Sequence, residues 1–338
     1  MVLLTPDDLC LITDSRYATV AQGMVEAAGS GGLRFVQVAS SYEETLCALL
    51  KNVGVARVGI ETAHMTVARH DWLERALVGS GVTLGGTTGL VESLRQVKDA
   101  QELATMREAG RRISGVMKEM LSRLCAGRGE REVAADIDWA IRAAGFDGPA
   151  FETIVAGGPN TALPHARPGD RRLGVGDLVL LDFGGLFGGY CVDLTRVASL
   201  GPPDAAAVSW HRAVADAHAA ALAVVRPGVV ASAVDTAARS VLDQRGLGAA
   251  FGHGTGHGLG IDVHEAPRVG KRRSAAGAAA DVGSLDGDDV PLEPGMVFTI
   301  EPGVYLPGQG GVRLEDDLVV TADGYELLTS VSLDLVII

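Results

Sequence analysis

The sequence lacks long hydrophobic runs, a surplus of basic residues and clustered cysteines. No stretch approaches the roughly 20 apolar residues that cross a bilayer, and the first ten residues, MVLLTPDDLC, lack the basic segment that begins a signal peptide. Acidic residues outnumber basic ones by 42 to 29, and the net charge of −13 would repel nucleic-acid phosphates. We therefore expect a cytoplasmic protein that binds neither membranes nor nucleic acid.

The four cysteines lie far apart and form no C-x-x-C pair. Disulfide frameworks and structural zinc sites both place cysteines at recurring spacings, which this chain does not have. We interpret all four as buried thiols in a reducing compartment. They are Cys10, Cys47, Cys125 and Cys191.

The first 95 residues alternate β-rich runs with amphipathic segments. This pattern predicts a small α/β domain with a largely parallel sheet. The predicted strands cover residues 9–13, 34–38, 57–61 and 82–85, and the predicted helices cover 17–28, 42–53 and 65–78. A length of 338 residues favours two domains, and we expect the second to cover residues 97–338.

The second region combines long helices with paired strands. Apolar residues at helical spacing predict helices over 99–125, 130–144, 204–225 and 231–245. Strand-like runs cover 178–184, 190–198, 296–304 and 311–321, and a Gly-rich turn joins each successive pair. Two antiparallel hairpins follow from this arrangement. The span 271–289 has no periodicity and is interpreted as a surface insertion.

Each predicted hairpin carries two acidic residues within apolar strands. Asp182 and Asp193 lie in the first hairpin, and Glu301 and Glu315 lie in the second. A single acid of this kind is usually a turn or strand-edge residue, because a buried carboxylate is costly unless it is paired or bound to metal. Four such acids in two matching hairpins favour a metal site.

A histidine-rich, glycine-rich stretch, GHGTGHGLGIDVHEAPR (252–268), lies between the two hairpins. Four carboxylates and one imidazole from it would form an oxygen-rich ligand set with about four negative charges, which two divalent cations would balance. Such a set suits Mn²⁺, our first choice, or Co²⁺, Fe²⁺ or Zn²⁺ in a two-metal hydrolytic site.

Five motifs in order resemble those of the metallopeptidases with the pita-bread fold. They are LDFGG (181–185), DLTR (193–196), GTGHGLG (254–260), TIEPG (299–303) and RLED (313–316). This family includes aminopeptidase P, prolidase and methionine aminopeptidase. The resemblance is close over residues 97–338 and looser over 1–95. It implies an α+β pita-bread catalytic domain preceded by a small amino-terminal α/β domain.

The resemblance implies a role for each acid and for one histidine. Asp193 and Glu315 would bridge two ions, Asp182 would hold one of them, and His257 with Glu301 would hold the other. A water activated by both ions would be the nucleophile, and Glu301 would take and return its proton.

Three further histidines match substrate-side residues of the family. His264 would hydrogen-bond the scissile carbonyl, His253 would line the pocket beyond the scissile bond, and His165 would approach from a preceding loop. The glycines around His257 would let the backbone approach the metals closely. The remaining histidines are interpreted as residues on the solvated faces of helices. They are His64, His70, His211 and His218.

Three features resemble the proline-specific branch, which cleaves between an amino-terminal residue and a following proline: the amino-terminal domain, His253 and Arg313. The resemblance also makes Arg313 a candidate substrate-binding residue. In that branch, aminopeptidase P accepts tripeptides and longer peptides, whereas prolidase requires an Xaa-Pro dipeptide and a cation for its carboxylate. Arg268 is a candidate for that cation and equally for a loop-stabilising residue. No second basic residue lies between His253 and Arg268, which favours aminopeptidase P. Prolidase is the alternative, and a non-catalytic pita-bread binding protein is a third one, against which the intact ligand set argues.

The resemblance also implies a homodimer, because the amino-terminal domain assists dimerisation in relatives. Relatives begin with a helix and a strand before the segment that resembles LITDSRYATVAQ (11–22), whereas this chain begins almost directly on it. We therefore expect a reduced or shortened amino-terminal domain.

Overall fold

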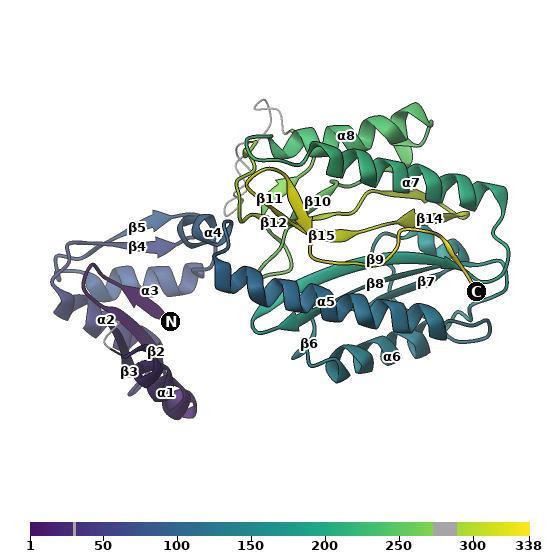
Figure 1. The fold of residues 1–338 in the computed structure, drawn as a ribbon. Helices are drawn as coiled ribbons and strands as arrows, with labels where there is room; N and C mark the ends of the chain where they lie inside the picture. The colour runs from purple at the N-terminus through teal and green to yellow at the C-terminus, as the bar shows by residue number, and fades with distance from the viewer. Residues whose placement is uncertain (30–31, 273–288) are drawn as a thin grey trace. The chain divides into compact units, whose positions relative to one another are not determined.

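The computed structural model of the chain describes residues 1–29, 32–272 and 289–338 (Figure 1). Almost all of the predicted insertion 271–289 lies outside these residues. The chain divides into two compact units, with the boundary between Leu90 and Val91. No helix within the described residues is both long and apolar enough to cross a bilayer.

The amino-terminal unit has the predicted strand–helix alternation, but its described strands form two separate sheets instead of one. In the first sheet β2 pairs with β1 antiparallel and with β3 in parallel, and in the second β4 pairs with β5 in parallel. The strands are β1 (Val2–Leu4), β2 (Leu9–Thr13), β3 (Leu33–Gln37), β4 (Arg57–Glu61) and β5 (Thr83–Thr87). The helices are α1 (Ala18–Ala28), α2 (Tyr42–Val53) and α3 (Val67–Leu77).

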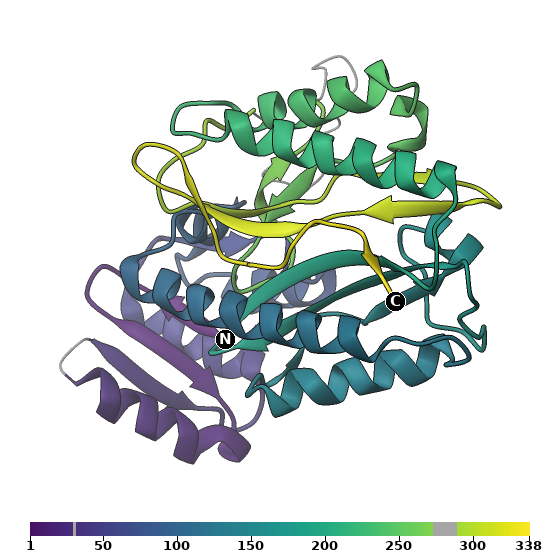
Figure 2. The same ribbon diagram turned by 45° about the vertical axis from the view of Figure 1, so that its right-hand side comes forward.

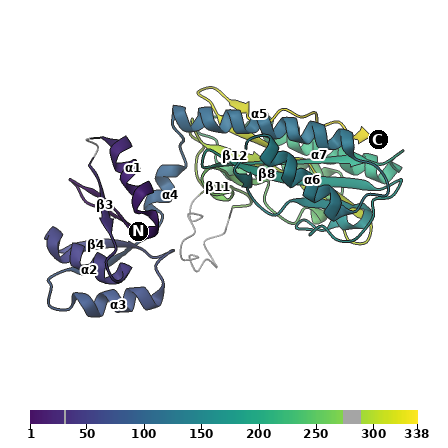
Figure 3. The same cartoon turned by 90° about the horizontal axis from the view of Figure 1, so that it is seen from below.

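The carboxy-terminal unit begins with helices that cover one face of the first acidic hairpin. After the short α4 (Leu90–Arg95), helix α5 (Ala100–Arg123) begins at a capping box in which Asp99 and Glu102 bond each other's backbone N–H. Figures 2 and 3 show α5 and α6 (Glu130–Ala143) along the sheet that contains β8 and β9. The paired strands of this sheet are β6 (Gly148–Pro149), β7 (Ile154–Gly157), β8 (Leu178–Phe187), β9 (Tyr190–Ser199) and β17 (Val336–Ile337).

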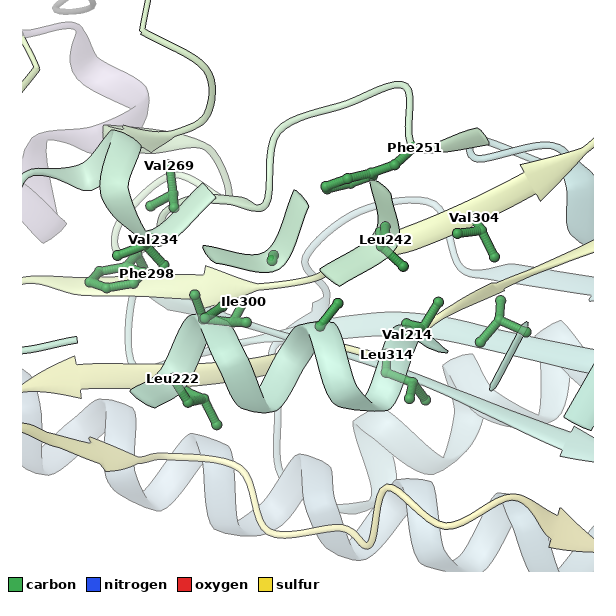
Figure 4. Packing of buried hydrophobic residues seen from close by; sticks show 14 of the residues in the cluster. Val214, Leu222, Val234, Leu242, Phe251, Val269, Phe298, Ile300, Val304 and Leu314 are labelled. Atoms are coloured by element: carbon green, nitrogen blue, oxygen red, sulfur yellow. The ribbon is translucent and has the colours of Figure 1, made fainter. Parts of the chain in front are cut away.

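A second helical layer, α7 (Ala205–Val224) and α8 (Ala231–Gln244), covers a second sheet. Its strand order is β11-β10-β12-β15-β16. Figure 4 shows Val214, Leu222 and Val234 of these helices packed with Phe298 and Ile300 of β12. The strands are β10 (Gly256–Gly258), β11 (Glu265–Val269), β12 (Val297–Ile300), β15 (Asp316–Val320) and β16 (Tyr325–Leu327).

The second acidic hairpin differs from the prediction, because both of its strands are interrupted. Pro302 has no N–H for the ladder, and β12 ends before it. The parts of the two strands nearest the turn, β13 (Gly303–Leu306) and β14 (Gly310–Arg313), pair with each other, while β12 pairs with β15. The two interruptions lie at Glu301 and at Leu314–Glu315. Both glutamates are therefore at joints between strands.

Two sequence-based interpretations of single residues are wrong. His211 and His218 are not on a solvated face, since they are 7% and 0% exposed and α7 packs them inward. The Nε2 atom of His218 lies 3.3 Å from a carboxylate oxygen of Asp316. Helix α7 is rich in alanine on all sides, so its sequence offers little contrast between faces. Cys125 is exposed, whereas the other three cysteines are buried, and all four are free.

Candidate active site

The first acidic hairpin places two carboxylates on one face of its sheet. Asp182 is the Cα partner of Thr195, and Asp193 is the partner of Gly184, so the period of two in each strand points these side chains to the same side. Asp182 and Asp193 are 7% and 6% exposed. A Cβ on Gly184 would lie 2.0 Å from the carbonyl oxygen of Val192, which explains the glycine after LDF.

The joints in the second hairpin place Glu301 and Glu315 against the same region. The Glu301 amide donates to the carbonyl of Thr255 at 2.7 Å, and the Glu315 amide donates to that of Thr195 at 3.2 Å. The Thr195 hydroxyl also donates to Oε2 of Glu315 at 2.6 Å. The backbone and side chain of Thr195 thus hold Glu315 beside the first hairpin.

His257 on β10 turns one ring nitrogen toward these acids. Its Nδ1 lies 3.1 Å from the carbonyl oxygen of Gly258, which only accepts, so Nδ1 carries the proton and Nε2 presents a lone pair. Nε2 lies 3.6 Å from Oε1 of Glu301 and 4.0 Å from Oδ2 of Asp193. A Cβ on Gly256 would lie 1.9 Å from the carbonyl oxygen of Thr299, so this strand requires glycine beside the histidine.

The electrostatics of the cluster fit divalent cations. Ligand atoms of Asp193, His257 and Glu315 lie within 4.8 Å of one another. One carboxylate oxygen of Asp182 and one of Asp193 are buried with no hydrogen-bond partner. Burial, followed by repulsion from neighbouring acids, raises the pKa of Asp193 and of Glu315 well above the ordinary range. Acids held this close together, with free lone pairs, are compensated by metal ions in proteins.

The pKa values of Glu301 and His257 fit the same description. Burial is the main cause that raises the pKa of Glu301 to about 8. Burial also lowers the pKa of His257 to about 4, which keeps its imidazole neutral and able to bind a metal at neutral pH. The structure therefore brings together all five residues that the sequence proposed as ligands.

Arg313 is a buried residue next to the acidic cluster, with 3% of its surface exposed. Its guanidinium donates to Asp182 Oδ2, to the Tyr305 hydroxyl at 2.7 Å and to Thr195 Oγ1 at 3.4 Å. The Tyr305 hydroxyl in turn lies 2.8 Å from Nε2 of His253. Because Nδ1 of His253 bonds the carbonyl of Gly254 at 2.7 Å, Nε2 accepts and Tyr305 donates. A continuous chain of hydrogen bonds therefore joins a predicted metal ligand to a substrate-side histidine.

Tyr305 and Thr195 were not identified from the sequence. Tyr305 is a buried aromatic residue in a short strand, and such residues are usually part of a core. Thr195 lies inside the DLTR motif, which was a detectable signal. The assignment of Arg313 to direct substrate binding stays a prediction, since the hydrogen bonds of its guanidinium go to protein groups.

His264 faces an open cavity beside the acidic cluster. His264 is an exposed residue whose ring stacks edge-on against the His257 ring, with 4.3 Å between ring centroids. Partial burial of the ring lowers its pKa, which favours the neutral imidazole, and a neutral imidazole can donate a hydrogen bond from one nitrogen. The cavity has a volume of about 400 Å³. Its lining includes Ala150, Leu186, Cys191, Ile261 and Val263.

The last two predicted site residues are exposed at the edge of this region. His165 follows the short helix η2 (Gly158–Ala162), in a loop that the buried carboxylate of Glu130 braces by accepting from the amides of Gly157 and Gly169. Arg268 on β11 is the Cα partner of His257, so both side chains leave the same face of the sheet.

Comparison with known proteins gives consistent results. The sequence profile of metallopeptidase family M24 matches residues 104–322, and that of the Creatinase/Prolidase N-terminal domain matches residues 1–97. An Xaa-Pro dipeptidase from Bacillus anthracis is similar, with a TM-score of 0.90 and 32% identity over 100% of this chain and 88% of the other. An X-Pro aminopeptidase from Thermotoga maritima has a TM-score of 0.86 and 30% identity over 100% and 90%. A prolidase from Pyrococcus furiosus has a TM-score of 0.84 and 28% identity over 98% and 90%.

Proposed function

The chain belongs to metallopeptidase family M24, and on that premise we propose that it hydrolyses the bond between an amino-terminal residue and a following proline. Its fold is the α+β pita-bread fold with a creatinase-type amino-terminal domain, as the sequence motifs predicted. The observation that carries the proposal is the group of four carboxylates and one neutral imidazole beside the exposed His264, in which three of the acids are buried and Glu301 and His257 are partly buried.

Two divalent ions, Mn²⁺ first among them, are proposed as the cofactor. Asp193 and Glu315 would hold both ions, as the resemblance implies, and ligand atoms of these two acids and of His257 lie within 4.8 Å of one another. Asp182 would complete one ion and Glu301 the other. When bound, the ions would supply Lewis-acid activation of the attacking water and of the peptide carbonyl.

The chain's own residues would move the proton and orient the peptide. Glu301 would take the proton of the attacking water and return it to the departing amine, as the resemblance implies. His264 would donate a hydrogen bond to the scissile carbonyl oxygen, where negative charge develops. His253 would line the substrate pocket with its ring, since both of its nitrogens bond protein groups. His165 would contact the substrate from its loop.

We further propose that Xaa-Pro dipeptides are better substrates than longer peptides, which reverses the preference drawn from the sequence. Two of the three similar structures above are described as an Xaa-Pro dipeptidase and a prolidase, and one as an aminopeptidase. Arg268 is exposed and leaves the sheet on the same side as His257, and one of its nitrogens donates to the carbonyl of Lys271 at 3.1 Å, so both a carboxylate-binding and a loop-stabilising role fit it. A guanidinium there can bind a dipeptide's free carboxylate through paired hydrogen bonds.

One comparison of substrates tests this function. The chain, loaded with Mn²⁺, is assayed with Ala-Pro, Ala-Pro-Ala and Ala-Ala. We expect the highest kcat/KM for Ala-Pro, and we expect Arg268→Ala to raise KM for Ala-Pro about tenfold while leaving any tripeptide hydrolysis unchanged. Arg172→Ala, an exposed arginine that donates to the carbonyl of Gly127, is the control. A higher kcat/KM for Ala-Pro-Ala would instead identify an aminopeptidase P.

Two further features are proposed on the resemblance and the composition alone. A homodimer is expected, and sedimentation of the purified chain at several concentrations measures it. A cytoplasmic location is expected, and cell fractionation measures it.

A further inference from the structure

Helix α8 contributes no metal ligand and no substrate-side residue, yet two of its charged side chains are buried beside the loop that carries His253. Asp235 and Arg239 lie one turn apart, and the guanidinium donates to the carboxylate at 2.8 and 3.1 Å. The side chain of Asp235 is 1% exposed and that of Arg239 is 12% exposed. A buried ion pair is stable only where further hydrogen bonds satisfy it, so its other partners show what the pair holds.

The guanidinium of Arg239 also donates to the backbone of the loop that carries His253. It donates to the carbonyl of Phe251 at 3.0 Å and to that of His253 at 2.8 Å. Its guanidinium also lies over the Phe251 ring, 4.2 Å from the centroid. That ring packs edge-on against the His253 imidazole, with 5.1 Å between centroids. Arg239 therefore fixes both the backbone of His253 and one side of its ring.

Asp235 holds the next residues of the same loop. Its Oδ1 accepts from the amide of Thr255 at 3.1 Å and from its hydroxyl at 2.9 Å. Thr255 is 0% exposed, and its carbonyl accepts from the amide of Glu301 at 2.7 Å. Through one threonine, Asp235 is thus connected to the backbone of a proposed metal ligand.

We propose that Asp235 and Arg239 are positioning residues of the active site. Arg239 sets the position of His253 toward the substrate, and Asp235 sets the backbone from which Glu301 projects. This inference rests on the proposed function, in which His253 lines the substrate pocket. Since His253 binds substrate and does not take part in bond breaking, the loss of the Arg239 contacts is expressed in KM.

Arg239→Lys is the direct test, because lysine keeps a charge beside Asp235 but cannot donate to the carboxylate and to two carbonyls in fixed directions. We expect KM for Ala-Pro to rise about tenfold, with kcat within about twofold and metal content unchanged. In Arg239→Ala, millimolar guanidinium should restore KM toward the wild-type value. Arg245→Ala is the matched control, because it removes an ion pair with Asp216 whose side chains are 37% and 46% exposed. It should leave KM unchanged.

If Asp235 and Arg239 only stabilise the fold, the kinetics of Arg239→Lys will differ from this expectation. In that case kcat and the unfolding temperature of Arg239→Lys fall together, KM stays at the wild-type value, and guanidinium restores nothing. That outcome would overturn the inference.

A local measurement separates this inference from the proposed function. Hydrogen exchange of the amides of residues 251–255 should be faster in Arg239→Lys than in the wild type and in Arg245→Ala, while exchange in α5 is the same in all three. If the wild type cleaves no Xaa-Pro substrate, the proposed function fails and the exchange comparison still tests the positioning. Unchanged exchange over 251–255 in Arg239→Lys would refute the positioning whatever the activity.

Discussion

The Nε2 atom of His257 lies 3.6 Å from Oε1 of Glu301, too far for a hydrogen bond and close enough for both atoms to bind one cation. His257 comes from the strand β10, and Glu301 follows β12, which is paired to β10 through Gly258 and Phe298. The sheet therefore sets this separation before any ion binds.

The ion-free chain should lose stability as the pH rises. Burial raises the pKa of Glu301 from 4.5 to about 8, and it raises the pKa values of Asp193 and Glu315 in the same direction. Groups with a raised pKa stabilise the folded state while protonated, and this contribution disappears as the pH rises through about 8. Bound divalent ions would pair with the ionised acids and abolish this loss.

Thermal unfolding measures this effect in chelator and in Mn²⁺, between about pH 6.5 and pH 9. Below this window the lowered pKa values of His253 and His257, both about 4, act in the opposite sense, because those imidazoles are neutral in the folded state. An unfolding temperature in chelator that rises toward pH 9 would contradict the assigned burial of the acids.

Substitution of a central acid should remove metal as well as activity. Glu315→Ala deletes a carboxylate that is proposed to contact both ions, so metal content and turnover should both fall to background. Thr195→Val removes only the hydroxyl that donates to Glu315, so it should weaken metal binding by about 10- to 100-fold and retain activity at high metal concentration. Metal titration of both variants by calorimetry makes the comparison, and full metal content in Glu315→Ala would mean that this ligand is misassigned.

His264→Ala should separate catalysis from metal binding. The imidazole lies beside the cluster but is not in the ligand set, so metal content should equal that of the wild type. We expect kcat to fall about a hundredfold, the usual effect of removing one donor to a developing oxyanion. His70→Ala, in the amino-terminal unit, is the control. Wild-type kcat in His264→Ala would show that another group contacts the carbonyl.

Tyr305→Phe tests the hydrogen-bond chain between His253 and Arg313. It removes the hydroxyl that donates to His253 and accepts from Arg313, and it leaves a buried guanidinium donor unpaired. We expect kcat/KM to fall about tenfold or more, with both ions retained. Steady-state kinetics beside elemental analysis measures this, and unchanged kinetics would mean that the chain of bonds does not support the site.

Helix positions and the presence of an acidic cluster were predictable because local signals specify them. Helix α2 covers Tyr42–Val53, as predicted, since Ser41 caps its first turn and Gly54 adopts a left-handed conformation at its end. The acids of the cluster were noticeable because acids within apolar strands are rare without a partner. Their glycine-rich surroundings are explained by backbone contacts such as that between Gly256 and Thr299.

Features that depend on distant contacts could not be read from the chain. The division of the second hairpin depends on β12 pairing with β15 and β13 with β14, and alternation within each run does not show it. His218 is buried beside Asp316, which lies about a hundred positions away in the sequence. Tyr305 gains its role only because Arg313 and His253 fold onto its hydroxyl.

Metal content measured together with Ala-Pro hydrolysis on one preparation is the decisive test of the proposed two-metal peptidase. We expect two divalent ions per chain, complete loss of hydrolysis after chelation and dialysis, and its return on addition of Mn²⁺. Asp193→Ala should neither bind the ions nor recover activity. Full hydrolysis by a chain in which elemental analysis finds no metal would contradict the proposed metal-dependent mechanism.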